Sequence, residues 1–268
     1  MGGMNVDGAR LRRELRSLGV RRGSVLLTHC SMHAVGLVDG GATTLLEALL
    51  KVLGEHGTLV VPTQTRSKST SSTDFLRAVS GLSPAQRESY LELLPGFDPV
   101  LSPSEGMGAL SEAVRIHPGA SRSTHPTTSF AAVGGNAAEL TAAHPLDDIL
   151  GDGSPLGWMY RAEAFVLLLG VEYDKCTAFH LGEDWSTAPL RGYRFKIGDQ
   201  WQDVPEARNY DDSDFMELGA RFEVEHKEEI AFGPVGAASC RLFPLAAAAE
   251  FAAKWLPETR RGGARLAR

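Results

Sequence analysis

The spacing of apolar residues divides the chain into amphipathic helices and short buried strands. Residues 7–18 place leucines three and four positions apart among arginine and glutamate, which is typical of an amphipathic helix. Further helices are predicted over residues 42–53, 107–116, 136–143, 155–160, 178–186, 212–222 and 245–255. Short apolar runs, which are typical of buried strands, occupy residues 24–29, 58–62, 129–133, 164–170 and 239–243. An alternating pattern over residues 193–204 predicts a hairpin that turns at Gly198 and Asp199.

The order of these elements predicts an α/β fold. Residues 24–62 form a strand, a helix and a strand, and such a unit is right-handed with its two strands parallel. We expect a mixed, mostly parallel central sheet flanked by helices. Neither an internal repeat nor a linker divides residues 1–268, so a single domain is expected. Residues 63–105 are polar and rich in serine, threonine and proline, which predicts a long loop region with helical pieces over an active site. Residues 260–268 are expected to fray.

Composition and charge narrow the class of partner. The chain has 27 basic and 33 acidic residues, and this balance excludes the basic footprint of a nucleic-acid-binding protein. Its longest apolar run, residues 165–171, is far shorter than the ~20 residues that a membrane span needs. The three cysteines form no C-x-x-C pair, and the first residues resemble no export signal. We therefore expect a cytoplasmic protein, a monomer or a homodimer, that binds no metal, no membrane and no nucleic acid.

The first candidate for catalysis follows the apolar strand 164–170. His180 and Glu183 lie three residues apart in a predicted helix, so the carboxylate can orient the imidazole. Ligands of α/β proteins bind beyond the carboxyl ends of strands, where a histidine can act as a general base. The same spacing also fits a histidine at a helix start that is merely satisfied by its neighbour. Both interpretations stay open at this point.

Two further segments carry groups that suit a phosphate. His29 and His33 flank the turn after the first strand, where Gly36 and free backbone N–H groups can bind an anion, although a plain strand end fits as well. Arg122 and Ser123 combine a guanidinium with a hydroxyl, and a turn held by an arginine fits them equally. A metal-dependent hydrolase using His29 and His33 is a minor alternative, because no H-E-x-x-H motif is present.

Several motifs follow one another along most of the chain. They are Leu26-Leu-Thr-His29-Cys-Ser31-Met32, Gly57-Thr-Leu-Val-Val-Pro62-Thr, Pro95-Gly-Phe97-Asp98-Pro99, Arg122-Ser123-Thr-His125-Pro126, Gly151-Asp-Gly-Ser154-Pro155-Leu156, Val166-Leu-Leu-Leu-Gly170-Val171, and Thr177 with His180-Leu-Gly-Glu183. Each motif alone is weak, but the ordered set resembles the antibiotic N-acetyltransferase family, whose named member is the aminoglycoside 3-N-acetyltransferase. The resemblance covers about residues 8–256 and implies the α/β fold of that family.

The resemblance also implies a reaction and roles for named residues. The donor is acetyl-coenzyme A, the acceptor is a primary amine, and transfer is direct. His180 falls at the family's catalytic histidine, Glu183 is its carboxylate partner, and His29 lies beside the reaction centre. The implied coenzyme contacts are Ser31, Met32, Val35, Gly36, Arg122, Ser123 and Thr177.

The acceptor site is where this sequence departs from the family. Members that act on polycationic aminoglycosides often carry several acidic residues after the second strand, whereas residues 64–70 here are basic and rich in hydroxyls. We expect that the acceptor is an aminoglycoside antibiotic and that its acetylation confers resistance to this antibiotic. Its expected contacts are Asp74, Asp98, Asp152 and Asp184, and further acidic candidates are Asp211 and Asp212. Two alternatives stay open: N-acetylation of another amine, including an anionic one, and a coenzyme-binding protein without catalysis.

Overall fold

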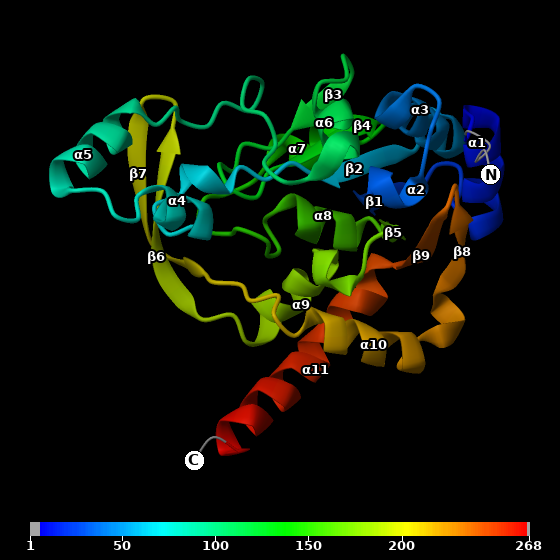
Figure 1. Cartoon of the computed structure of the whole chain (residues 1–268). Helices are drawn as coiled ribbons and strands as arrows, with labels where there is room; N and C mark the ends of the chain where they lie inside the picture. The colour runs from blue at the N-terminus through cyan, green and yellow to red at the C-terminus, as the bar shows by residue number, and fades with distance from the viewer. Residues whose placement is uncertain (1–5, 267–268) are drawn as a thin grey trace.

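Seven strands form a mixed sheet at the centre of the computed structural model, which describes residues 6–266, with side chains up to residue 260 (Figure 1). The strands are β1 (Val25–Cys30), β2 (Thr58–Pro62), β3 (Ala120–Arg122), β4 (Phe130–Gly134), β5 (Phe165–Leu169), β8 (Ala231–Val235) and β9 (Ala238–Pro244). Their order is β3-β4-β2-β1-β5-β9-β8. The central strands β2, β1 and β5 are parallel, and the pairs on both flanks are antiparallel. The expected mixed sheet is confirmed, but its parallel part is limited to the middle, because only two of the six strand pairs in the described residues, β1 with β2 and β1 with β5, are parallel.

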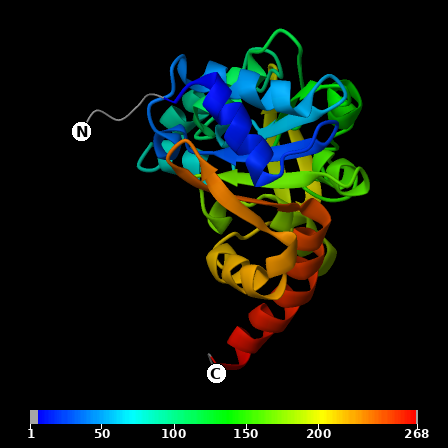
Figure 2. The ribbon, with the colours of Figure 1, turned by 90° about the vertical axis from the view of Figure 1, so that its right-hand side faces the viewer.

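Helices cover both faces of this sheet. The helices of the described residues are α1 (Gly8–Leu18), α2 (Met32–Val35), α3 (Gly41–Leu53), α4 (Thr73–Ala78), α5 (Pro84–Leu93), α6 (Gly108–Arg115), α7 (Ala137–Ala142), α8 (Pro155–Arg161), α9 (Ala178–Ser186), α10 (Phe215–Glu225) and α11 (Leu245–Leu266), with short 3-10 turns η1 (Arg66–Lys68), η2 (Tyr173–Lys175) and η3 (Lys227–Glu229). Of these, α4 and α5 lie apart from the sheet and pack in a cluster of their own. Successive strand residues point to opposite faces, so Leu26 packs with α1 and α3 while Leu27 packs with α8 to α11. Figure 2 shows α1 on one side of the sheet and α10 and α11 on the other. Among the described residues, no helix has the length and apolar character needed to cross a membrane.

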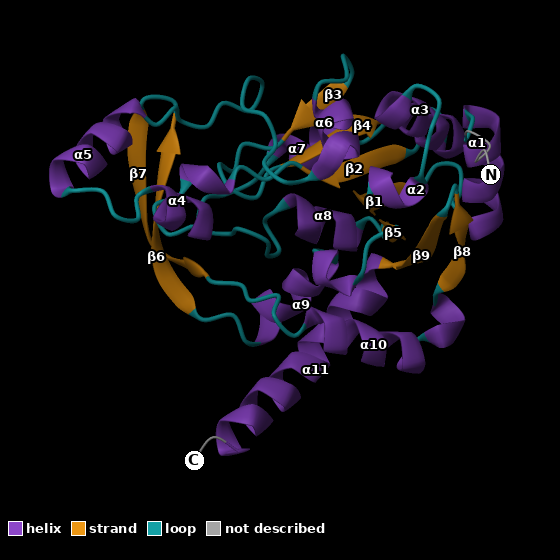
Figure 3. Ribbon diagram, viewed as in Figure 1, coloured by secondary structure: helices purple, strands orange, loops and turns teal. Residues whose placement is uncertain are grey.

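A separate two-stranded ribbon of β6 (Leu190–Ile197) and β7 (Gln200–Arg208) lies beside α4 and α5 (Figure 3). This ribbon is the predicted hairpin, and its turn lies at Gly198. It extends beyond the predicted residues 193–204, because strand pairing continues past a register irregularity as far as Leu190 and Arg208. The polar region predicted as a long loop contains η1, α4 and α5. Its Phe97 donates a backbone N–H to the carbonyl of Lys196 at 2.8 Å, so the loop region and the ribbon are tied together.

Two strands and one helix start differ from the sequence prediction for local reasons. β3 has only three half-buried residues, and glycine and proline interrupt the apolar run of β8, so neither carries a strand pattern. α10 begins at Phe215 rather than at residue 212. There the Asp211 carboxylate accepts the backbone N–H of Ser213 at 3.0 Å and holds a turn before the helix.

Helices α9 and α11 pack with almost no space between their backbones. A Cβ atom at Gly182 would lie 2.1 Å from the carbonyl oxygen of Ala249 and 2.6 Å from the nitrogen of Ala253, so only glycine fits. α11 continues to Leu266, and the prediction that residues 260–268 fray is wrong for the described part of that segment. The last two residues lie outside the described range. This contact fixes the position of α9, the helix that carries the histidine and glutamate singled out from the sequence.

Gly182→Ala is expected to destabilise the protein, because the added methyl group forces the two helices apart. Overpacking of this kind costs about 1–3 kcal/mol. Urea unfolding followed by circular dichroism measures the free energy. Gly119→Ala is the matched control, since its added Cβ would meet its nearest atoms at an ordinary 3.4 Å. Equal unfolding midpoints for the two variants would contradict the close helix contact.

Candidate active site

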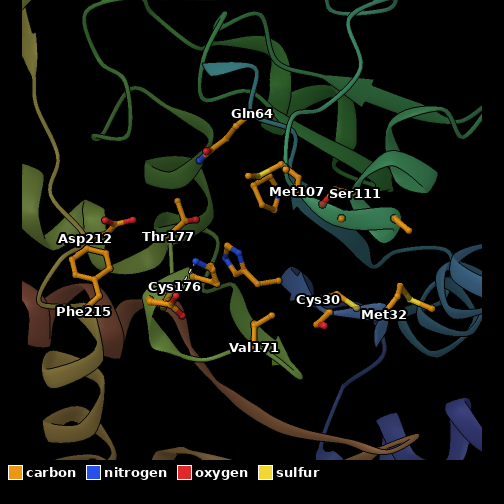
Figure 4. Close-up of a pocket in the computed structure, with 18 of the residues that line it drawn as sticks. Cys30, Met32, Gln64, Met107, Ser111, Val171, Cys176, Thr177, Asp212 and Phe215 are labelled. Carbon is orange, nitrogen blue, oxygen red and sulfur yellow. Dashed lines mark ion pairs between the residues drawn. The ribbon is translucent and has the colours of Figure 1, made fainter. Parts of the chain in front are cut away.

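Two cavities meet near the carboxyl ends of the parallel strands, and His180 lies in the wall of both. The first, of about 480 Å³, is lined by the end of β1, the start of α6 and the segment that leads into α9 (Figure 4). The second, of about 590 Å³, is lined by η1, α4, β6 and the segment before α10. Gln64, Arg66 and Asp212 also line both cavities. The arrangement leaves room for two reactants with one imidazole between them.

A carboxylate and two aromatic rings set the orientation of His180. The helix α9 begins after Thr177, which lines the first cavity, so His180 lies in its first turn. Its Nδ1 lies 2.8 Å from Oε2 of Glu183. The rings of Tyr210 and Phe215 pack beside the imidazole, with centroids 5.2 and 4.7 Å from its own. Because Nδ1 faces a carboxylate, we assign the hydrogen to Nδ1, and this assignment leaves Nε2 with the lone pair that can accept a proton.

Glu183 is fully buried, and each of its carboxylate oxygens has partners. Oε2 contacts His180, while Oε1 accepts the backbone N–H of Asp211 at 2.9 Å and an Nη1–H of Arg260 at 2.7 Å. A buried carboxylate needs such partners, because they replace the water that it loses. The structure thus brings the predicted pair together, in an arrangement where the carboxylate can stabilise an imidazolium.

His29 lies at the end of β1 in the wall of the first cavity, and it stays neutral. Burial, and secondly the nearby His180, lower its pKa to about 3. Its buried Nε2 has no hydrogen-bond partner among the described residues. A neutral imidazole with one free ring nitrogen can make a hydrogen bond, but with this pKa it is too weak a base to take a proton from an ammonium at neutral pH. His29 and His180 therefore differ in what they can do.

Only part of the segment after β1, which contains α2, lines the first cavity. Ser31, Met32 and His33 line it. Val35 is fully buried in the core, and Gly36 ends α2 with a φ of 91° that favours glycine. Neither of these two lines the cavity. Over the part of the chain that the structure covers, no three His, Cys, Asp or Glu side chains gather as a metal site.

Arg122 and Ser123 make internal contacts and line neither cavity. The Arg122 guanidinium donates to the hydroxyl and the carbonyl oxygen of Thr63, at 3.1 and 2.6 Å, and to the carbonyl oxygen of Ser102 at 2.5 Å. The hydroxyl of Ser123 contacts Nδ1 of His144 at 2.9 Å and is fully buried. The Arg122 guanidinium thus holds neighbouring backbone segments together, and its binding of a phosphate stays a prediction.

Of the four predicted acceptor contacts, Asp74 lines the second cavity, and the other three lie in neither wall. Asp98 accepts two backbone N–H groups of its own loop at 2.8 Å each. Asp152 accepts an indole N–H at 2.9 Å. Asp184 accepts the hydroxyl of Tyr210 at 2.7 Å, so it supports a ring that packs beside the imidazole of His180.

Several residues at the site carry no signal in the sequence. Tyr210 and Phe215 flank His180, and Arg260 reaches Glu183 across a sequence separation of 77 residues. No local pattern marks them, because the contacts arise only when α9, α10 and α11 pack together. Asp212, in contrast, belongs to the acidic candidates named from the sequence. It lines the first cavity, as Figure 4 shows, and also the second.

Known proteins with similar sequences are described as aminoglycoside acetyltransferases or as proteins like them. A family model described as aminoglycoside 3-N-acetyltransferase matches residues 27–257. In Bacillus subtilis, the SPbeta prophage-derived aminoglycoside N(3')-acetyltransferase-like protein YokD is 35% identical over 252 residues, which cover 90% of this chain and 89% of that protein. Aminoglycoside N(3)-acetyltransferase VII of Streptomyces paromomycinus is 35% identical, over 94% of this chain and 92% of its own length.

Solved structures extend the comparison to the fold. The crystal structure of YokD has a TM-score of 0.89 and 32% identity, and the match covers 96% of both chains. A structure of AAC-IIIb in a binary complex with CoASH has a TM-score of 0.81 and 28% identity, over 95% of this chain and 97% of that one. The resemblance found in the sequence motifs is confirmed, and the chain belongs to the aminoglycoside 3-N-acetyltransferase family of acetyl-coenzyme A-dependent acyltransferases.

Proposed function

We propose that this protein transfers an acetyl group from acetyl-coenzyme A to an amino group of an aminoglycoside, with His180 as the general base. The observation that carries the proposal is the place of His180 in the wall of both cavities, with its Nδ1 held by Glu183. A base at this junction can reach an amine in one cavity while a thioester occupies the other. Acetylation removes a positive charge from the drug, and the expected consequence is antibiotic resistance.

We assign the first cavity to the coenzyme. The relative that was solved with CoASH supports coenzyme binding by a chain of this fold. Ser31, Met32 and Thr177 line this cavity, and Arg66 and Lys175 supply cations that suit phosphates. The assignment leaves out the expected coenzyme contacts that line neither cavity, which are Val35, Gly36, Arg122 and Ser123.

The chemistry follows from the groups at the junction. The amine reaches its free-base form by losing one proton to solvent, and its nitrogen then attacks the thioester carbonyl carbon while Nε2 of His180 takes a second proton. Negative charge develops on the carbonyl oxygen, for which we assign the Thr177 hydroxyl and neutral His29 as hydrogen-bond donors. Collapse of the intermediate breaks the C–S bond, and the imidazolium gives its proton to the leaving thiolate. Glu183 stabilises the imidazolium between these steps.

A second candidate acceptor is an amine that also carries an anionic group. Arg66, Arg77 and Arg191 line the second cavity, together with Asp74 and Asp212. A polycation meets both attraction and repulsion among these side chains, whereas an amine with a carboxylate or phosphate group finds a partner for each of its charges.

Release of free thiol from acetyl-coenzyme A tests the proposal directly. The assay pairs the protein with aminoglycosides and, separately, with amines that carry a carboxylate or phosphate. Faster turnover of aminoglycosides supports the first candidate, and faster turnover of anionic amines supports the second. If acetyl-coenzyme A raises the melting temperature but no amine causes thiol release, the protein binds the coenzyme without catalysis.

His180→Ala is expected to lower kcat about 10²–10⁴-fold, because it removes the general base. Its affinity for acetyl-coenzyme A should stay nearly the same, since the remaining cavity wall is intact. Glu183→Gln should lower kcat less, because the amide still contacts the ring but no longer stabilises its cation. Steady-state kinetics and calorimetric titration measure both effects, with circular dichroism as a check of folding. Wild-type turnover by folded His180→Ala would contradict the assignment of the base.

His29→Gln is expected to lower kcat and to leave the acid limb of the pH–rate profile in place. With a pKa lowered to about 3, His29 is neutral at every pH of the assay and adds no ionisation there. The rate should still fall as the pH falls, because the base at the junction is another group. Rate profiles of the variant and the wild-type protein test this. Disappearance of the acid limb in His29→Gln would mean that His29 is the titrating base.

Asp74→Asn is expected to raise KM for aminoglycosides and to leave KM for acetyl-coenzyme A unchanged, because Asp74 lines the second cavity and not the first. The increase should be roughly 3–10-fold, since a partly exposed ion pair contributes about 1 kcal/mol. Asp98→Asn is the matched control, because Asp98 is a carboxylate of the same 63–105 region that lines neither cavity. An equal increase in both variants would show that the second cavity is not the acceptor site.

A further inference from the structure

The Arg260 side chain, in the C-terminal half of α11, donates five hydrogen bonds to residues at or next to the site, more than an arginine in an ordinary surface ion pair makes. Its Nη1 lies 2.7 Å from Oε1 of Glu183, and its Nε and Nη2 each lie 2.9 Å from one carboxylate oxygen of Asp214. Nη2 also donates to the carbonyl oxygen of Asp211 at 2.7 Å, and Nη1 to the hydroxyl of Thr187 at 3.2 Å. Every nitrogen of the guanidinium therefore donates at least one hydrogen bond. Arg260 lies outside residues 27–257, which the family model matches.

The first consequence concerns the rotation of the Glu183 carboxylate. Arg260 and the backbone N–H of Asp211 hold Oε1, so Oε2 is the oxygen that faces Nδ1 of His180. A guanidinium is planar with donors in fixed directions, and it therefore restricts a carboxylate more than a lysine ammonium does. Without Arg260, the buried Oε1 keeps a single partner and the carboxylate can turn away from the imidazole.

The second consequence concerns the segment 211–214, which precedes α10. Arg260 holds this segment at both ends, through the carbonyl of Asp211 and the carboxylate of Asp214. Between them, Asp212 lines both cavities, and Phe215, the first residue of α10, packs beside the imidazole of His180. One cation thus connects the base, its carboxylate partner and part of the cavity wall.

We propose that Arg260 is a positioning residue for acetyl transfer. It holds Glu183 so that the carboxylate keeps Nδ1 of His180 in place and Nε2 faces the junction of the cavities. Arg260 lines neither cavity, so it acts through Glu183 and the segment 211–214. The inference rests on the proposed function, because it assumes that His180 is the base.

A merely structural role would have different consequences. α11 is already held to α9 by the close contact at Gly182, and to the sheet by the backbone N–H of Leu245, which donates to the carbonyl of Ala164 at 2.8 Å. These contacts involve residues 245–253, in the first half of α11, and Figure 1 shows the C-terminal end of this helix extending away from the sheet. Loss of Arg260 should therefore leave the packing of the helix in place and change the reaction.

The experiment compares Arg260→Leu and Arg260→Lys in the full-length protein, with Arg10→Leu as the matched control. Arg10 is also a half-buried arginine, with its Nε 2.7 Å from Glu14 and its Nη2 3.2 Å from the carbonyl oxygen of Gly236, but it lies on α1 across the sheet. Arg260→Leu should lower kcat about 10–100-fold, as loss of a group that orients a catalytic side chain does. KM for acetyl-coenzyme A should change less than about 3-fold, and Arg10→Leu should match the wild-type protein.

The pH–rate profile gives a readout that a structural role would not move. His180 is surrounded by Glu183, Asp211, Asp212, His29 and Tyr210, and Arg260 balances the charge of the first. Without Arg260 the Glu183 carboxylate can turn away from the imidazolium that it stabilises, so the acid limb of Arg260→Leu should move to lower pH. Arg260→Lys should return the limb toward its original position and recover part of kcat, because it restores the charge without the planar geometry.

Combination with Glu183→Gln completes the test. Because Arg260 acts mainly through that carboxylate, adding Arg260→Leu to Glu183→Gln should lower kcat less than about 3-fold further. The inference is overturned if Arg260→Leu keeps the wild-type kcat and pH profile, or if the losses from the two substitutions multiply. If Arg260→Leu does not fold, an Arg260→Lys variant with unchanged kcat and profile overturns it equally. A wild-type protein that releases no thiol with any amine overturns the proposed function, which is a separate outcome.

Discussion

The buried carboxylate of Glu183 is the constraint on which the site depends. A charge without access to water must have partners on both oxygens, and these come from His180 in its own helix, from Asp211 before α10 and from Arg260 in α11. Satisfying one carboxylate therefore draws three separate segments to one point. The orientation of the imidazole, and with it the free lone pair of Nε2, follows from that arrangement.

The topology of the sheet supplies the rest of the reaction centre. β1 and β5 are adjacent and parallel, and His29 pairs in register with Leu168. Both strands end at the same edge, so the turn after β1 and the segment after β5 face each other across the first cavity. The close approach of α11 at Gly182 then holds α9 against this edge. Because of this strand pairing, His29 and His180 line the same cavity although they are far apart in sequence.

Local patterns were sufficient for part of this arrangement and insufficient for the rest. Helical spacing predicts the His180–Glu183 contact, and the apolar runs predict the parallel strands that carry the site. Arg122 shows the limit of such reasoning, because an arginine beside hydroxyls looks the same whether it binds a phosphate or holds a turn. Arg260 shows a second limit, since a contact between distant helices leaves no periodic signal, and the end of the chain was expected to fray.

The central claim is that Nδ1 of His180 carries the hydrogen toward Glu183 and that Nε2 is the free base at the junction of the cavities. Nitrogen-15 NMR of protein labelled at histidine reports the tautomer of each neutral imidazole, with a His180→Ala sample to assign the signals. The account predicts that the neutral His180 ring is protonated at Nδ1 and unprotonated at Nε2, both in the free protein and with acetyl-coenzyme A added. A ring protonated at Nε2 would leave no base facing the amine and would contradict the account.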